Sequence, residues 1–170
     1  DGTGGEVSLT GGAWGLGRIS ADYNTPLDSK GNALFRINTA LHKENSFQDY
    51  GVNKTFMVSP TFTFKANDRL TLNVEAEYFK SNRTTSYINP SGVNVKNLNE
   101  LNLDWNKSFA SNDVTSKAEV LNLFAEAVYK ISDKWTSHTL FSHSRLDNDA
   151  NYLFLDIKST DSLSRRLMHI

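Results

Sequence analysis

Apolar and polar side chains alternate along segment after segment of this chain of 170 residues. In residues 55–65 the apolar side chains occupy the even positions, and residues 70–78 repeat the pattern after the short polar sequence 66–69. A period of two places successive side chains on opposite faces of a β-strand, so the two segments predict a hairpin. This pattern leaves little room for helix.

The same alternation predicts seven strands and an eighth that begins near Leu163. The seven lie at residues 6–10, 18–24, 35–42, 55–65, 70–78, 121–131 and 135–145. The predicted fold class is therefore all-β, an antiparallel meander of about seven or eight long strands.

The connections between these strands differ in length. Short turns are expected at 25–32, 66–69 and 132–134, and longer loops at 44–54, 84–117 and 148–162, with a tight glycine-rich turn around Trp14 as the exception. Because every second connection of a meander lies at the same edge, the long loops gather at one edge and the short turns at the other. Transmembrane β-barrels have short periplasmic turns and long extracellular loops, so the asymmetry favours a barrel wall.

Aromatic residues support the same interpretation. Tyr23, Phe35, Phe64, Tyr129 and Trp135 all fall next to the short turns, where a membrane barrel carries an interfacial girdle. The mean hydropathy of −0.46 agrees with such a barrel, because lipid-facing apolar and inward-facing polar residues average out.

Composition narrows the remaining classes. The chain has no cysteine, which excludes a disulfide framework or a thiolate metal site, and its formal net charge of −1 argues against nucleic acid as a partner. With few histidines, no metal site is expected, and no arrangement of catalytic residues stands out, so the chain is not expected to be an enzyme.

Residues 6–83 resemble the opening of the barrel domain of TonB-dependent outer-membrane receptors of the ferrichrome-receptor type. The resemblance is carried by DYNTPL (22–27) after a glycine turn and Arg18, then FRIN (35–38), VSPTFTF (58–64) and RLTLNVEAEY (69–78), in the family's order and spacing. It implies a barrel of 22 strands, closed by an N-terminal plug, in the bacterial outer membrane.

The resemblance also implies a function and partners. Residues 1–170 would form a single segment of the barrel domain, whose parent chain supplies the plug and the remaining strands. The parent would take up a ferric siderophore or a similar nutrient, with energy delivered by the TonB complex through an N-terminal segment outside these residues, and with no covalently bound cofactor.

Ligand contacts are expected in the long extracellular loop 84–117 and the upper lumen. Tyr87, Trp105 and Phe109 provide flat apolar surfaces among many asparagine amides in that loop, which suits a polar ligand with an extended scaffold. Phe79 and Arg83 share the lumen face of the preceding strand by parity. These five residues are the predicted ligand-binding set.

Four charged residues are expected to line the lumen and face the plug. They are Arg18, Arg36, Glu75 and Glu77, each on the polar side of its strand.

Two alternatives remain open from the sequence. One is a self-contained eight-stranded outer-membrane barrel, for which 170 residues is a suitable length. The other is a soluble, secreted β-sandwich that acts as a binding module.

Overall fold

The computed structural model describes residues 2–89, 94, 96–111, 113–160 and 162–170. Its strands are β1 (Gly4–Gly11), β2 (Gly17–Pro26), β3 (Ala33–Asn45), β4 (Val52–Asn67), β5 (Leu70–Thr84), β6 (Ser86–Asn89), β7 (Thr115–Ser132), β8 (Trp135–Ser159) and β9 (Ser162–His169), with short 3₁₀ turns η1 (Ala13–Gly15) and η2 (Leu98–Glu100). No helix in this part of the chain is long and apolar enough to cross a membrane.

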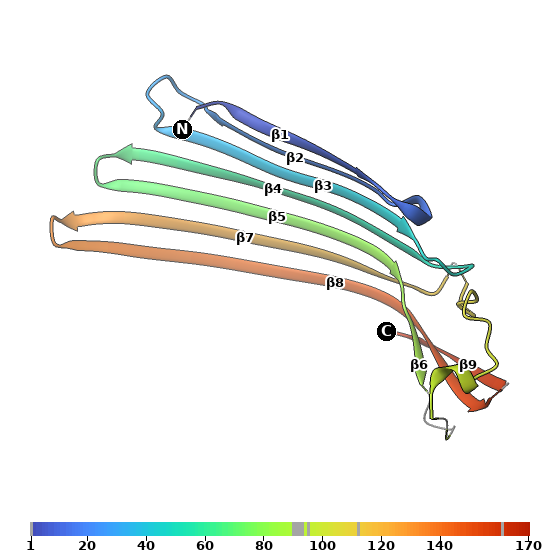
Figure 1. Ribbon diagram of the computed structural model, residues 1–170. Coiled ribbons are helices and arrows are strands. Elements are labelled where there is room, and N and C mark those ends of the chain that lie inside the picture. Colours follow the sequence, from blue (N-terminus) through green and yellow to red (C-terminus); the bar gives the residue numbers. More distant parts are fainter. Residues whose placement is uncertain (1, 90–93, 95, 112, 161) are drawn as a thin grey trace.

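The long strands lie side by side in one curved layer (Figure 1). Neighbours pair antiparallel in the order β1-β2-β3-β4-β5-β7-β8, which confirms the predicted meander. Among the described residues β1 pairs with β2 alone, so the layer is open. The chain therefore forms neither the closed eight-stranded barrel nor the two packed sheets of a sandwich.

Strand lengths suit a wall that crosses a membrane at a tilt. β4, β5 and β7 contain 16, 15 and 18 residues. A tilted transmembrane strand needs about 9–11 residues, so these strands extend past the hydrocarbon layer.

The sheet has an apolar face and a polar face. Residues paired directly across strands project to the same side, and Leu9, Ile19, Leu41 and Phe56 follow one another in register across β1 to β4. Leu9 and Leu41 are 78% and 53% exposed on this apolar face. Such a continuous exposed apolar surface is typical of a barrel wall facing lipid.

The aromatic residues near the short turns lie on the apolar face. Tyr23, Phe35, Phe64 and Tyr129 pair with Ile37, Phe62, Leu72 and Leu70, and Trp135 begins β8 with 71% exposure. Their placement agrees with the predicted girdle.

Pro60 interrupts one ladder in the middle of the sheet. β3 and β4 pair through Ile37 and Pro60, whereas the β4–β5 register passes from Val58 directly to Thr61. Proline has no N–H to donate to a neighbouring strand, which accounts for the gap.

The prediction of a long loop over residues 148–162 is wrong. β8 continues to Ser159, and β9 returns from Ser162, near the predicted start at Leu163, to pair antiparallel with it; residue 161 lies outside the described residues. β6 pairs parallel with the same part of β8. Neighbours on both edges satisfy the backbone groups of β8 where it extends beyond β7.

A candidate ligand-binding site at the long-loop end

The buried core of the described residues lies at the long-loop end. Leu153, Leu155 and Ile157, on one side of β8, are only 2%, 3% and 1% exposed. Two of them pack with Ala110 and Val114, and Phe109 and Leu163 lie against this cluster. The β8–β9 hairpin is thus supported by the connection between β5 and β7.

The other side of β8 carries an aromatic surface. Tyr87 of β6, Phe154 of β8 and Arg166 of β9 are directly paired across the three strands. We call these three residues the aromatic row. The Tyr87 and Phe154 rings stack with centroids 5.6 Å apart, and the Arg166 Cζ atom lies 5.1 Å from the Phe154 centroid. Tyr152 extends the surface, with its ring 6.0 Å from that of Tyr87.

This arrangement is suited to flat, electron-rich or anionic ligand groups. Tyr87 is 51% exposed, and Arg166 at the other end of the row is also exposed. Aromatic faces provide dispersion contact, and the guanidinium provides charge and directed N–H donors.

Trp105 and Phe109 lie together in a different place. Both line a small crevice with Leu155, Ile157 and Leu163, on the buried side of the hairpin. Phe109 adopts a positive φ of 55°, which costs a non-glycine residue about 1–2 kcal/mol. The packing of Phe109 against the core cluster offsets that strain. Phe109 therefore stabilises the loop, whether or not it also contacts a ligand.

The loop between β3 and β4, residues 46–51, holds the connection between β5 and β7 in place. The Gln48 amide donates to the carbonyl oxygens of Trp105 and Lys107, at 3.0 and 3.2 Å, and the Asp49 N–H donates to Asn106 O at 2.8 Å. Asp49 Oδ1 in turn accepts hydrogen bonds from Ser108. The Ser108 backbone N–H holds the pKa of Asp49 below its ordinary value, with further hydrogen bonds from the Ser108 hydroxyl and Tyr50 N–H.

Phe79 and Arg83 lie on the polar face of β5, where Phe79 pairs with Met57 and Val120, and Arg83 with Asn53 and Ser116. Phe79 is half-buried and Arg83 is exposed. The structure thus distributes the five predicted ligand residues over three places: the aromatic row, the crevice and the polar face.

The four charged residues predicted for the lumen lie on the polar face. Arg36 makes two hydrogen bonds to the Asp22 carboxylate, and Glu77 accepts one from the Asn122 amide at 2.9 Å. Arg18 pairs across the sheet with Thr10 and His42. Glu75 pairs with Thr61 and Phe124. Among the described residues, no three histidine, aspartate or glutamate side chains gather as a metal site.

Tyr152, Phe154 and Arg166 were not among the predicted site residues. Tyr152 and Phe154 lie in a segment expected to be a loop, although residues 152–155 (YLFL) form a short apolar run of the kind that a buried strand can have. That apolar run was the available signal. The position of Arg166 opposite Phe154 depends on the β8–β9 register and has no signal in the sequence.

Comparison with known proteins shows which of them this chain resembles. No family model matches the chain. Over 70 residues, 41% of this chain, it is 36% identical to the metal-pseudopaline receptor CntO of Pseudomonas aeruginosa strain UCBPP-PA14, and it spans a tenth of that relative's length.

Solved structures match over nearly the whole chain. The ferric-catecholate import receptor Fiu of E. coli K12 gives a TM-score of 0.79 at 15% identity, covering 99% of this chain and 26% of Fiu. The pyoverdine outer-membrane receptor FpvA of Pseudomonas aeruginosa PAO1 gives 0.76 at 18% identity, covering 96% and 25%. Together with the open sheet and its two faces, these matches show that the chain has the fold of a β-barrel wall segment of TonB-dependent outer-membrane siderophore receptors.

Proposed function

We propose that the chain forms part of the barrel wall of a receptor that takes up a ferric siderophore, or a similar metal–chelator complex, across the outer membrane with energy from TonB. The aromatic row of Tyr87, Phe154 and Arg166 is the observation that carries this proposal, because it offers stacking surfaces and a cation at the long-loop end. The relatives support it, since their names describe receptors for metal-pseudopaline, ferric catecholate and pyoverdine.

In this proposal the long-loop end faces the outside of the cell. Residues 84–117 form an extracellular loop, of which residues 90–93, 95 and 112 lie outside the described part of the chain. Trp105 and Phe109 support the loop from within, and Tyr87 meets the ligand. The function is binding and gated passage, with no covalent chemistry on the ligand.

The polar face would line the lumen and meet the plug. Arg36 and Glu75 project from it at one level, since both pair with Thr61. Toward the loops follow Glu77, Phe79, Arg18 and Arg83, in that order. A folded plug carries hydrogen-bonding groups of both kinds on its surface, and these side chains provide partners for them. The remaining strands and the plug are expected from the same parent chain.

Fluorescence titration tests the proposal. The full-length protein containing these residues is purified in detergent and titrated with ferric pyoverdine, a ferric triscatecholate and a zinc–pseudopaline complex. Trp14 and Trp105 both lie at the long-loop end, so we expect saturable quenching by one of these complexes and a weaker response to its metal-free chelator.

Uptake supplies the second measurement. Cells that depend on the protein should accumulate the labelled complex, and deletion of TonB should abolish accumulation while leaving surface binding intact. Saturable binding, together with accumulation that stays unchanged in cells without TonB, would contradict the proposal that TonB supplies the energy for uptake. Absence of binding to every metal complex would contradict the choice of ligand class.

A further inference from the structure

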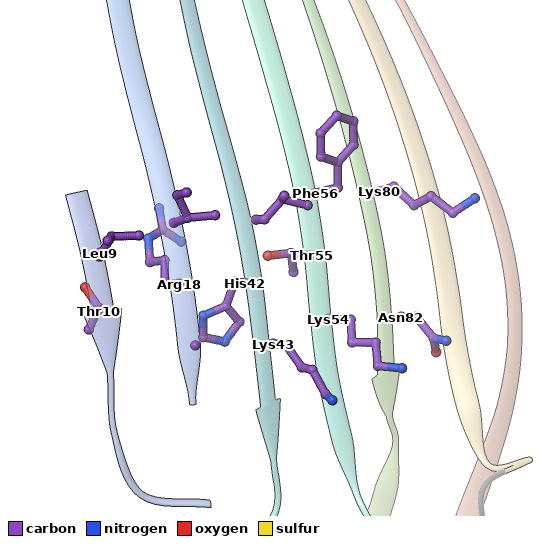
Figure 2. A pocket seen from close by; sticks show the side chains of 13 residues that line it. Leu9, Thr10, Arg18, His42, Lys43, Lys54, Thr55, Phe56, Lys80 and Asn82 are labelled. Atoms are coloured by element: carbon purple, nitrogen blue, oxygen red, sulfur yellow. The ribbon is translucent and has the colours of Figure 1, made fainter. Parts of the chain in front are cut away.

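A groove of about 690 Å³ lies on the apolar face near the long loops (Figure 2). Its apolar lining comes from Leu9, Ile19, Leu41 and Phe56, and Lys43 and Lys54 stand beside it at the next outward level of the same face. Thr10, Arg18, His42 and Thr55 also contribute to the lining and alternate with these residues along the strands. The groove thus joins an apolar floor to a cationic edge.

Lys43 and Lys54 are placed directly opposite each other on β3 and β4. Like charges in this position repel, so the pair is unfavourable without an anion nearby. Neither lysine forms an ion pair among the described residues, whereas Lys80 is paired with Glu119 at 2.5 Å on the same face. Glu44, the carboxylate next to Lys43, pairs with His42 and projects to the other face. Lys43 and Lys54 therefore form an uncompensated cationic pair.

The pair stands at the depth of a lipid headgroup. Ten residues separate Lys43 from Ala33 on β3, roughly 34 Å along the strand and about 26 Å along the membrane normal at a tilt of about 40°. The apolar band of an outer-membrane barrel is about 25 Å tall. With the aromatic girdle at one interface, the two lysines lie at the other.

Asn82 adds a second polar group beside the lysines. It pairs directly with Lys54 across β4 and β5 and also lines the groove. Among the described residues its Oδ1 atom is buried without a hydrogen-bond donor. Such an acceptor is suited to a hydroxyl or amide N–H, which points to a headgroup that carries these donors as well as phosphate.

We infer that this groove binds a phosphate-bearing glycolipid of the outer leaflet. Its acyl chains lie over Leu9, Ile19, Leu41 and Phe56, its phosphate lies between Lys43 and Lys54, and Asn82 accepts a hydrogen bond from its sugar or amide groups. The apolar floor favours a lipid over a free anion, because dissolved phosphate gains nothing from it. The site is separate from the proposed metal–chelate function, since none of Tyr87, Phe154 and Arg166 lines the groove.

Binding of lipid A tests this inference. The full-length protein in detergent is titrated with fluorescently labelled, bis-phosphorylated lipid A, and with unlabelled monophosphoryl lipid A, phosphatidylcholine and inorganic phosphate as competitors. The K43Q/K54Q variant should bind about thirty-fold more weakly, as expected for two lysines near anionic lipid. The control variant K30Q/K134Q removes the same charge from exposed lysines at the short turns and should bind like the wild type.

The competitors separate the sources of phosphate. Bis-phosphorylated lipid A should displace the label best, monophosphoryl lipid A less well, and phosphatidylcholine or inorganic phosphate hardly at all. Complete displacement by inorganic phosphate would identify a simple anion site and overturn the lipid assignment. Equal affinity of K43Q/K54Q and wild type, with both folded by circular dichroism and heat-modifiability, would also overturn it.

A second variant tests the apolar half of the groove. Leu41→Ala should weaken lipid A binding several-fold through lost contact with the acyl chains. Val74→Ala removes comparable exposed apolar surface elsewhere on the same face and should leave affinity unchanged. Equal losses in both variants would show nonspecific detergent or lipid adsorption and contradict a defined groove. These measurements use no siderophore, so their failure is distinguishable from failure of the proposed uptake.

Discussion

The Asp49 carboxylate accepts two hydrogen bonds from Ser108, 59 residues further along the chain, from the backbone N–H at 2.8 Å and from the hydroxyl at 3.1 Å. The two residues join the β3–β4 loop to the connection between β5 and β7. Both loops lie outside the strands that form the membrane wall. This contact links Phe109 and its crevice to the rest of the sheet.

Asp49→Asn should release this connection. The amide carries no charge and is a weaker acceptor for the Ser108 N–H. We expect faster hydrogen exchange at residues 104–109 than in the wild type at neutral pH. Asp133→Asn, in an exposed short turn, is the control and should leave exchange in that segment unchanged.

The pH dependence of the same contact has a definite sign. The folded-state pKa of Asp49 is lowered by the Ser108 N–H, so its stabilising contribution is present above the unfolded value of about 3.9. That contribution is lost as the pH falls through the lowered folded value. The wild type should therefore keep the same extra protection from hydrogen exchange, relative to D49N, from about pH 5 to 8. Loss of this extra protection near pH 6 would contradict its assignment to the Asp49 carboxylate.

Gly51→Ala should distort the β3–β4 loop. Gly51 has φ of 145°, and an added Cβ would lie 2.6 Å from Ser46 Cβ, the residue whose N–H closes the loop onto Gly51 O. Strain of this kind costs roughly 1–3 kcal/mol. We expect increased protease cleavage within residues 46–51, whereas Gly17→Ala, which places its Cβ in open space, should resist cleavage like the wild type.

Leu155→Ala should destabilise the β8–β9 hairpin. Its side chain is 3% exposed in the core cluster, and truncation of a buried leucine costs about 2–5 kcal/mol. The loss of stability should appear as faster hydrogen exchange in residues 151–169, while the strands of the wall stay protected from exchange. Leu167→Ala, on the partner strand and 66% exposed, is the control and should cost less than about 1 kcal/mol.

Phe154→Ala and Arg166→Gln should each weaken binding of the metal–chelator complex by about ten-fold, because one removes a stacking surface and the other a cation. The fluorescence titration measures both. Arg69→Gln, in the exposed turn between β4 and β5, is the matched charge control. Unchanged affinity in both row variants would move the ligand site to the crevice or the polar face.

The repeating strands were predictable because their signal is local. Residues 55–65 and 70–78 alternate clearly, and their short turn fixes an antiparallel hairpin that the structure reproduces as β4 and β5. Each strand of a membrane wall meets lipid on one face, so the period of two appears in the sequence whichever strand lies beside it.

The upper part of β8 was not predictable in the same way. Tyr152 and Phe154 lie on one side of the strand and Leu153 and Leu155 on the other, but all four are apolar, so no period of two in the sequence marks this segment. Loop 84–117 supplies the core on one side, and β6 and β9 supply the edges. Loop 84–117 and β6 lie far from β8 along the chain, and β9 pairs with β8 in a register that the sequence does not reveal.

The sequence by itself determined the alternating strands, their short turns and the two faces of the wall, because each depends on neighbouring residues and on the solvent that a face meets. Tertiary structure alone decided that Tyr87, Phe154 and Arg166 form one row, that Asp49 holds Ser108, and that Lys43 stands opposite Lys54. Cross-strand register and loop packing depend on contacts between distant segments, and no local pattern encodes them.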